Sequence, residues 1–380
     1  MSIIDPLPEI NSQKQFIDTL ADMVTPPKFA KPTRELRGRP YQLKTYLIES
    51  NNDGKLTQSF MLDSMIGEIR NTGLDTLKVL RLMSVEDERK PTQKPYHVEF
   101  YLDMSNPRFL LLHTNFHSRK VGRAVRNLVG STKFEFDHAW LSTTTLTGLS
   151  ERPGNTRSGY KIGYRDIFVE RDEEELMAEN NMVVEASGGL AQVLFQWTKQ
   201  DETLEKTLGY EYVRIARGYK SHGIEDDVWF DGRMSVKRGR SVEDHMVLVN
   251  SIKDEYCQKI TEAEKLRMDG RMEGDMAVID GFPFEFEFRR KVESWDGFLA
   301  HIFDGKEPFK LWGLKTKIRN GYYRILAVDM HTGHPLDIEV SEHILRVYLP
   351  KQSCGNVLLR LFVNLQRYFD ATIKCAQLSA

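Results

Sequence analysis

Cysteine and long apolar runs are scarce in this chain, and each scarcity excludes a class of protein. The three cysteines, Cys257, Cys354 and Cys375, are too few and too scattered for a disulfide framework or a thiolate metal site, which indicates a reducing compartment. No segment approaches the ~20 apolar residues of a membrane-spanning helix, and residues 1–8 lack the basic head and apolar run of a secretory signal. We therefore expect a cytoplasmic protein without a membrane partner.

The chain also lacks a large net charge, since it contains 53 basic and 55 acidic residues. This balance excludes a chain built as a whole to neutralise polyanions, so any nucleic-acid surface must be local. Internal repeats, a P-loop, a nucleophile elbow, a dinucleotide fingerprint and a kinase signature are all lacking. These absences leave nucleotide hydrolysis and dinucleotide chemistry unsupported.

The length, composition and hydrophobic periodicity of the chain predict an α+β fold of two domains, each a mixed or mainly antiparallel sheet packed with helices. A chain of 380 residues with 40% apolar content suits this number of domains. Residues 1–40, rich in proline, form an extended N-terminal arm with one helical segment at Gln13–Met23. Residues 41–175 form the N-terminal domain and residues 185–380 the C-terminal domain.

Periodicity predicts the main elements of both domains. In the first we expect strands at 42–49, 97–104 and 108–113, helices at 119–129 and 137–149, and a surface loop at 142–163. In the second we expect a long helix at 242–268 capped by Ser241, a helix at 292–303, a strand at 344–349 and a helix at 357–374. Asp231-Gly232 and Asn320-Gly321 predict hairpin turns between alternating apolar runs.

The segment from Glu273 to Arg289 carries the most chemistry. It contains Asp275, Glu285 and Glu287, lies between two helical patterns and ends in a cation. Its order of helix, strand, turn, strand and helix resembles the PD-(D/E)xK nuclease family over roughly forty residues. The resemblance implies that Asp275 and Glu287 hold Mg²⁺, with a third carboxylate from Glu262 or Glu264, while Arg289 or Lys291 offsets phosphate charge.

The segment departs from that family at one position, because Arg289 stands where its lysine is expected and arginine cannot lose a proton to act as a base. Register decides whether the site forms. A two-residue turn at Asp280-Gly281 places Asp275 opposite Phe286, whereas a three-residue loop at 280–282 places it opposite Glu287. The alternative is an amphipathic hairpin with Phe284, Phe286 and Phe288 in the core and Glu285, Glu287 and Arg289 in solvent.

Basic residues form four local clusters. Ser118 is suited to cap a helix on which Arg119, Arg123 and Arg126 share one face, with Lys120 adjacent. The others are Arg34, Arg37 and Arg39; Arg214, Arg217 and Lys220; and Lys237, Arg238 and Arg240. If clusters converge in the fold, they form a surface that binds phosphates; if not, they are solvated faces.

Two further groups are weaker candidates. The loop at 351–356 can present backbone N–H groups to an anion, although Ser353 or Asn356 also suits a simple helix cap. Asp329, His331 and His334, like His113 and His117, have no established metal-ligand spacing. We therefore expect a nucleic-acid-interacting protein, with an active or degenerate Mg²⁺-dependent nuclease-like segment. The alternatives are a non-enzymatic scaffold subunit with a protein partner and, less supported, an enzyme acting on a small molecule.

Overall fold

The computed structural model describes residues 7–24, 42–52, 55–85, 95–131, 135–165, 167–168, 181–218, 223–273 and 276–378. The chain divides into two compact units, each drawn from separate stretches of sequence. Unit 1 comprises residues 1–139, 216–228 and 232–253, and unit 2 comprises 140–215, 229–231 and 254–380. The part of the arm that carries Arg34, Arg37 and Arg39 lies outside the described residues, as do Lys220, Asp275 and residues 169–180 near the expected end of the N-terminal domain.

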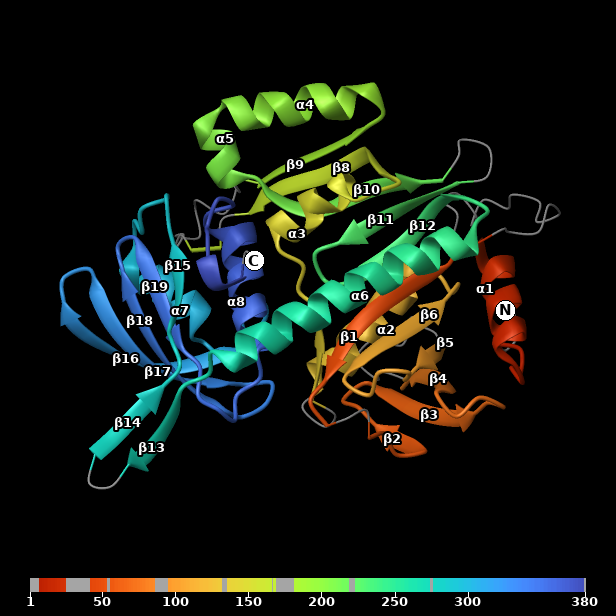
Figure 1. The fold of residues 1–380 in the computed structure, drawn as a ribbon, viewed down its shortest axis with the longest axis horizontal. Coiled ribbons are helices and arrows are strands. Elements are labelled where there is room, and N and C mark those ends of the chain that lie inside the picture. Colours follow the sequence, from red (N-terminus) through yellow and green to blue (C-terminus); the bar gives the residue numbers. More distant parts are fainter. Residues whose placement is uncertain are drawn as a thin grey trace. The chain divides into compact units, whose positions relative to one another are not determined.

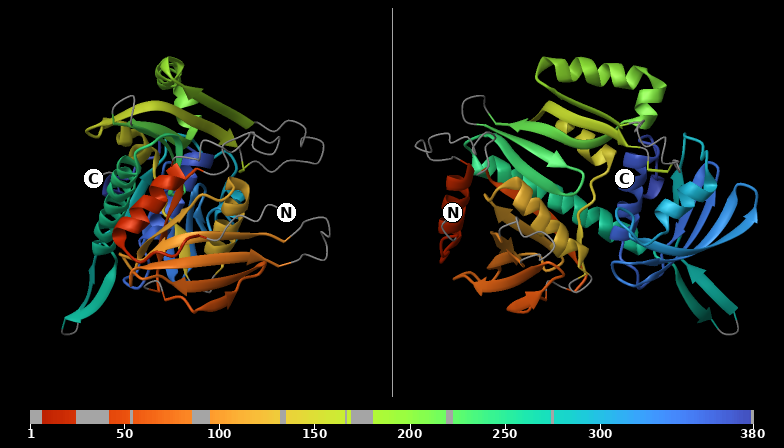
Figure 2. Two further views of the ribbon diagram at one scale, coloured as in Figure 1. Left: turned by 90° about the vertical axis from the view of Figure 1, so that its right-hand side faces the viewer. Right: turned by 180° about the vertical axis from the view of Figure 1, so that it is seen from behind.

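Both units are α+β, as the sequence predicted, and their strand pairings are antiparallel. In unit 1 the strands follow the order β2-β3-β4-β5-β6-β1-β12-β11, and β7 also pairs with β1 (Figure 1). Figure 2 shows the same strands from two other sides. The unit 1 strands are β1 Lys44–Ser50, β2 Ser59–Met61, β3 Met65–Asn71, β4 Leu77–Ser84, β5 His97–Asp103, β6 Phe109–Thr114, β7 Phe136–His138, β11 Ile224–Trp229, whose last residue falls in unit 2, and β12 Arg233–Gly239.

The core of unit 1 lies between this sheet and two helices, α1 (Gln13–Val24) and α2 (Ser118–Gly130). In α2, the apolar residues recur at helical spacing and are buried: Val121, Ala124, Val125, Leu128 and Val129. Helix α1 buries Phe16, Leu20, Met23 and Val24 in the same core. The helical segment of the N-terminal arm therefore contributes to the core of unit 1.

Unit 2 contains a sheet of order β15-β19-β18-β17-β16, a β13-β14 hairpin, and a β8-β9 pair beside β10. Helix α4 packs along β8 and β9, as Figure 1 shows. The strands are β8 Asn155–Arg165, β9 Asn181–Ser187, β10 Gly209–Arg217, which ends in unit 1, β13 Asp269–Glu273, β14 Met276–Asp280, β15 Phe284–Glu287, β16 Leu311–Arg319, β17 Tyr322–Asp329, β18 Pro335–Ser341 and β19 Ile344–Tyr348. The helices are α3 Thr143–Gly148, α4 Gly189–Gln200, α5 Glu202–Thr207, α7 Trp295–Ile302 and α8 Asn356–Tyr368.

Helix α6 (Val242–Lys265) confirms the long helix predicted after Ser241, whose Oγ accepts a hydrogen bond of 3.0 Å from the Asp244 amide. Its first residues belong to unit 1 and its last to unit 2. Both predicted hairpin turns are confirmed, with Gly232 and Gly321 at positive φ of 73° and 69°. None of the helices in the described ranges combines the length and the apolar composition needed to cross a membrane.

Two predictions around residues 137–163 were wrong. Residues 136–138 form β7, and the helix begins only at Thr143, where the Ser142 hydroxyl caps it by accepting from the Thr145 amide. The expected loop contains the long strand β8, whose small and polar residues are paired with β9 from Gly159 to Arg165. Sheet pairing therefore prevails over the turn-like composition of this stretch.

Candidate nucleic-acid interface

Two of the predicted basic clusters reach the same end of the unit 1 sheet. Strands β6 and β12 flank β1 on either side, and both run antiparallel to it, with Lys44 opposite Thr114 on β6 and Ser235 on β12. Both strands therefore continue past the start of β1 in the same direction. Because neighbouring strands lie about 5 Å apart, β6 and β12 are about 10 Å apart across β1, and β12 extends four residues beyond the position opposite Lys44.

The chain that follows β6 enters α2, which displays the first cluster. Arg119, Lys120, Arg123 and Arg126 are all exposed, on the side of α2 opposite its buried apolar face. The helix contains no acidic residue. The predicted cap was wrong: the N-cap is His117, whose Nδ1 accepts a hydrogen bond of 3.3 Å from the Arg119 amide, and Ser118 is the first helical residue.

The chain at the end of β12 displays the second cluster. Lys237, Arg238 and Arg240 are exposed, and the Lys237 carbonyl accepts from the side-chain amide of Gln42 at 3.0 Å. Arg238 pairs with Glu225 at 3.4 Å. Of the other cations in these two clusters, Arg119, Lys120, Arg123, Arg126 and Arg240 have no acidic partner among the described residues.

Burial and, to a smaller extent, neighbouring cations lower the pKa values of the titrating groups near these clusters. Lys44 is buried, and its Nζ donates to the carbonyls of Gln42 (2.8 Å) and Phe116 (2.9 Å). Burial, followed by the charge of Arg233, lowers the pKa of Lys44 to about 7.

The pKa values of His117 and His97, on the α2 side, are lowered by the same two kinds of cause. Burial lowers the pKa of His117, and the charges of Lys44, Lys120 and Arg119 lower it further. For His97, burial is again the main cause of a lowered pKa, with Arg81 next. Only the smaller part of each lowering, the part due to neighbouring cations, has the sign that favours an anion, because burial disfavours charge of either sign.

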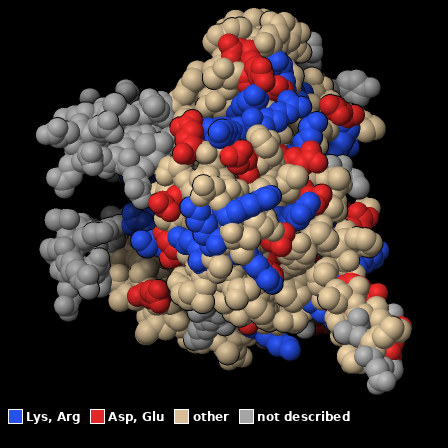
Figure 3. All heavy atoms as spheres, turned by 90° about the vertical axis from the view of Figure 1, so that its left-hand side faces the viewer, with Lys and Arg blue, Asp and Glu red and all other residues tan. Residues whose placement is uncertain are grey.

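The outer face of the β15–β19 sheet in unit 2 contrasts with this edge. Two of its arginines are paired across strands: Arg324 donates to Asp337 with Nε at 3.1 Å, and Arg346 donates to Glu285 at 2.5 Å. Figure 3 shows the side of the molecule that carries this sheet, with Lys and Arg side chains interspersed with Asp and Glu. Mutually paired charges of this kind contribute little attraction for a polyanion.

Neither register predicted for the nuclease-like segment is found in the strands that the structure describes. Strand β14 pairs with β13, and β15 pairs with β19, so residues 276–279 do not form the expected hairpin with residues 282–287, and Asp275 lies outside the described residues. Gly281 has a φ of 99°, and a Cβ there would lie 2.4 Å from the Arg267 carbonyl oxygen. The Asp280-Gly281 signal therefore marks close packing of the chain against the end of α6, with the Phe282 amide donating to the Leu266 carbonyl at 3.1 Å.

The remaining residues of that site have separate neighbours. The Glu264 Oε1 accepts from the Gly355 amide at 3.0 Å, whereas Glu287 ends β15 opposite Ile344. The Arg289 amide donates to Asp370 at 2.6 Å. No group of three potential metal ligands occurs among the described residues, and Mg²⁺ binding by Asp275, Glu287 and Glu264 stays a prediction.

The alternation of β15 is confirmed, since Phe284, Phe286 and Phe288 are buried while Glu287 and Arg289 are exposed and Glu285 is partly exposed. This is the core-facing pattern of the amphipathic alternative, although the partner strand is β19.

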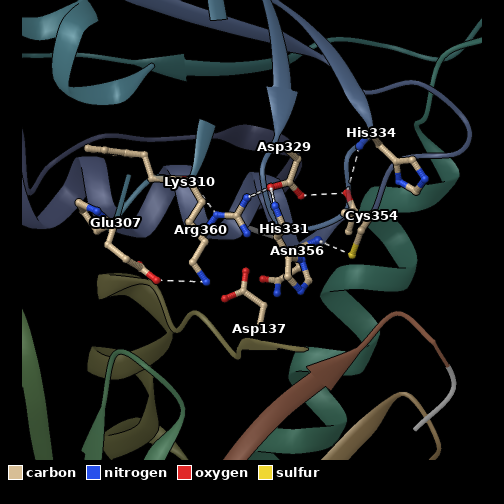
Figure 4. Close-up of polar contacts among 12 residues, drawn as sticks. Asp137, Glu307, Lys310, Asp329, His331, His334, Cys354, Asn356 and Arg360 are labelled. Carbon is tan, nitrogen blue, oxygen red and sulfur yellow. Dashed lines mark hydrogen bonds and ion pairs between the residues drawn. The ribbon is translucent and has the colours of Figure 1, made fainter. Parts of the chain in front are cut away.

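The histidine and cysteine candidates near β17 surround a buried ion pair in unit 2. Arg360 is fully buried and pairs with Asp329, which also accepts from the His331 amide at 3.1 Å and the Thr332 hydroxyl at 3.1 Å (Figure 4). The Arg360 Nε donates to the Phe309 carbonyl at 2.9 Å. These contacts indicate that Asp329 orders the β17–β18 turn.

The predicted cap of the last helix was wrong. Gly355 is the N-cap of α8 and makes no side-chain cap bond. The Asn356 side chain accepts from the Tyr256 hydroxyl at 2.8 Å, and the Ser353 hydroxyl donates to the Pro335 carbonyl at 3.1 Å. The Asn356 amide donates to Cys354 Sγ at 3.3 Å, and the cysteine is buried.

Unit 1 contains a buried polar chain that sequence reasoning missed. Asp226 Oδ1 contacts His245 Nδ1, His245 Nε2 contacts Thr45 Oγ1, and Thr45 Oγ1 contacts His113 Nδ1, each at 2.9 Å. All four side chains have no exposed surface. They come from four distant segments, so no local sequence signal could have identified them.

Comparison with known proteins identifies relatives along nearly the whole chain. Residues 7–379 match the model of a family described as MJECL33-like protein. The chain is 25% identical over 403 aligned positions to the uncharacterized protein MJECL33 of Methanocaldococcus jannaschii, covering 96% of this chain and 94% of that protein. No solved structure matches.

Proposed function

We propose that this chain, which belongs to the MJECL33-like protein family, binds the phosphate backbone of nucleic acids through the edge of unit 1 formed by α2 and the end of β12. The observation that carries the proposal is the convergence of two cationic clusters on one end of the sheet. A surface of this kind suits a polymer of regularly spaced anions.

The spacing on α2 supports a polymer over a single ion. Arg119 and Arg126 are seven residues apart, which corresponds to about 10 Å along a helix. Phosphates of one DNA strand recur about every 3.4 Å along the helix axis. The α2 face can therefore contact phosphates at several successive positions, while the β12 cluster lies across β1 from it.

Backbone contacts of this kind position a protein without reading sequence. The proposal therefore predicts binding that depends weakly on base sequence and strongly on salt. The acidic pairing of Arg238 with Glu225 makes that residue the weakest contributor of the two clusters.

The test is equilibrium binding of the full chain to fluorescently labelled duplex DNA, single-stranded DNA and single-stranded RNA, measured by anisotropy. The variant R119A/R123A/R126A removes three exposed charges, and we expect its affinity to fall by about tenfold or more at low salt. The control is K306A/K351A, which removes two exposed lysines paired with Asp304 and Asp269.

Equal affinity of the α2 variant and wild type for every labelled polymer would contradict the proposal. A protein that binds none of them at two salt concentrations would instead fit the scaffold alternative, in which the partner is another protein.

A further inference from the structure

A cavity in unit 2 has the composition of a small-molecule site. Its volume is about 430 Å³, and its walls come from α3, β8, α4 and α5, the chain after β15, and residues 366–374. This volume falls within the usual range of ligand pockets, roughly 300 to 1,000 Å³. The cavity is separate from the α2 and β12 clusters, which belong to unit 1.

Four cations and two carboxylates line the cavity, and their existing contacts distinguish them. Lys199 pairs with Glu205 at 2.8 Å. The Arg157 guanidinium donates to the Thr147 carbonyl at 3.0 Å and lies 4.4 Å from the centre of the Phe195 ring. Both of these cations are therefore already engaged.

The other two cations, Arg289 and Lys374, are exposed at the cavity wall, and among the described residues neither forms an ion pair, although the charge of Arg289 acts on Glu202 and helps to lower its pKa. The backbone brings them together. The Glu287 amide donates to the Lys374 carbonyl at 2.9 Å, and the Lys374 amide donates back at 3.3 Å. This bridge fixes Lys374 beside a position only two residues before Arg289.

A buried carboxylate holds both segments. Asp370 has no exposed surface, and its Oδ2 accepts from the amides of Arg289 (2.6 Å) and Arg290 (2.8 Å). Its Oδ1 accepts from the amide of Thr372 at 2.9 Å and from its hydroxyl at 2.6 Å. With four donors already bound, Asp370 positions the chain on both sides of the cavity before any ligand arrives.

The rest of the wall is mostly apolar and aromatic, carries neutral hydroxyls, and also includes the carboxylate of Glu151 and the side-chain amide of Gln366. Ile162, Leu208, Tyr210 and Ile373 are buried side chains at the cavity, and threonines of α3 also line it. Two cations without acidic partners, beside an apolar and aromatic wall, match a ligand with one doubly charged end and one flat or apolar end.

We propose that this cavity binds a phosphomonoester of a nucleoside, with Arg289 and Lys374 contacting the phosphate and the apolar wall enclosing the base or sugar. The ligand has two sources with the same chemistry, a free nucleoside 5′-monophosphate and the phosphorylated 5′ end of a nucleic-acid strand. The inference is independent of the α2 interface, since it depends on residues of unit 2 alone.

The experiment is calorimetric titration of the full chain with adenosine 5′-monophosphate, with adenosine, and with short oligonucleotides that carry or lack a 5′ phosphate. We expect at least one phosphorylated ligand to bind and its unphosphorylated counterpart to bind tenfold more weakly or not at all. The variant R289Q/K374Q should lose the preference for the phosphorylated form, whereas K306Q/K351Q should retain it.

Preferential binding of the mononucleotide identifies the free nucleotide as the source, and preferential binding of the phosphorylated oligonucleotide identifies the strand end. Two results would overturn the inference: no binding of either phosphorylated ligand at millimolar concentration, or a phosphate preference that R289Q/K374Q leaves unchanged. The α2 variant R119A/R123A/R126A should retain the phosphate preference, so failure of one proposal does not imply failure of the other.

Discussion

The buried hydrogen bonds that link the side chains of Asp226, His245, Thr45 and His113 make the stability of unit 1 sensitive to mild acid. Burial is the main cause that lowers the pKa of His113 from 6.5 to about 3. A neutral His113 donates from Nδ1 to Thr45, whose hydroxyl donates to His245, whose Nδ1 donates to Asp226. His113 Nε2 has no hydrogen-bond partner among the described residues, so a proton added there would be a buried charge.

The sign of the effect follows from this lowered pKa. Unfolded His113 takes up a proton as the pH falls through 6.5, whereas folded His113 does not until about pH 3, so stability is lost across that interval. Each pKa unit is worth about 1.4 kcal/mol. The full interval therefore corresponds to roughly 5 kcal/mol, and the part between pH 7 and pH 5 to about 2 kcal/mol.

The perturbation is His113→Gln, which removes the titrating group and keeps a polar side chain. All five tryptophans fall within unit 2, so their fluorescence does not report on unit 1. The assay is therefore amide hydrogen exchange of peptides covering β1 and β6, converted to opening free energies at pH 7 and pH 5. We expect the decrease between the two pH values to be about 2 kcal/mol smaller in the variant than in wild type.

The control is His343→Gln at an exposed histidine, which should retain the wild-type pH dependence. The same decrease in His113→Gln as in wild type would refute the assignment of a neutral, buried His113.

Two further predictions compare matched pairs by chemical denaturation. Arg360→Met breaks a fully buried ion pair with Asp329 and should lower the free energy of unfolding by about 3 to 5 kcal/mol. Arg324→Met breaks an exposed pair and should lower it by less than about 1 kcal/mol. Equal losses in the two variants would contradict this contrast. Gly232→Ala should destabilise by about 1 to 3 kcal/mol, because φ is 73° and the new Cβ would lie 2.8 Å from the Leu47 carbonyl oxygen. Gly130→Ala has open space around the new Cβ and should be neutral or stabilising; a cost as large as that of Gly232→Ala would show that backbone strain is not the cause.

Elements with strong local periodicity were predictable from sequence. The strands β1, β5 and β6 and the helices α2 and α6 lie within a few residues of their expected bounds, since the helices carry apolar residues at helical spacing and the strands are short runs rich in aromatic or branched residues that are buried along nearly their whole length. The region of β2–β4 lacks so clear a pattern, because several of its side chains are only partly buried.

The candidate interface was predictable only in part. The spacing of Arg119, Arg123 and Arg126 identified one face of α2, and the structure shows these residues exposed. The β12 cluster reaches the same end of the sheet because β1 pairs with both β6 and β12. No local sequence pattern predicts these pairings. The nuclease-like hairpin was mispredicted because Asp280-Gly281 is a strong local turn signal. In the structure, the glycine is needed because the chain packs closely against the end of α6.

The most direct test of the proposed interface is the dependence of nucleic-acid affinity on salt. Each phosphate contact contributes about 0.9 to the slope of log affinity against log salt on duplex DNA. We expect R119A/R123A/R126A to lower this slope by about 2 to 3 relative to wild type and K306A/K351A to leave it unchanged. A slope in the α2 variant equal to that of wild type would contradict the claim that these arginines contact phosphates.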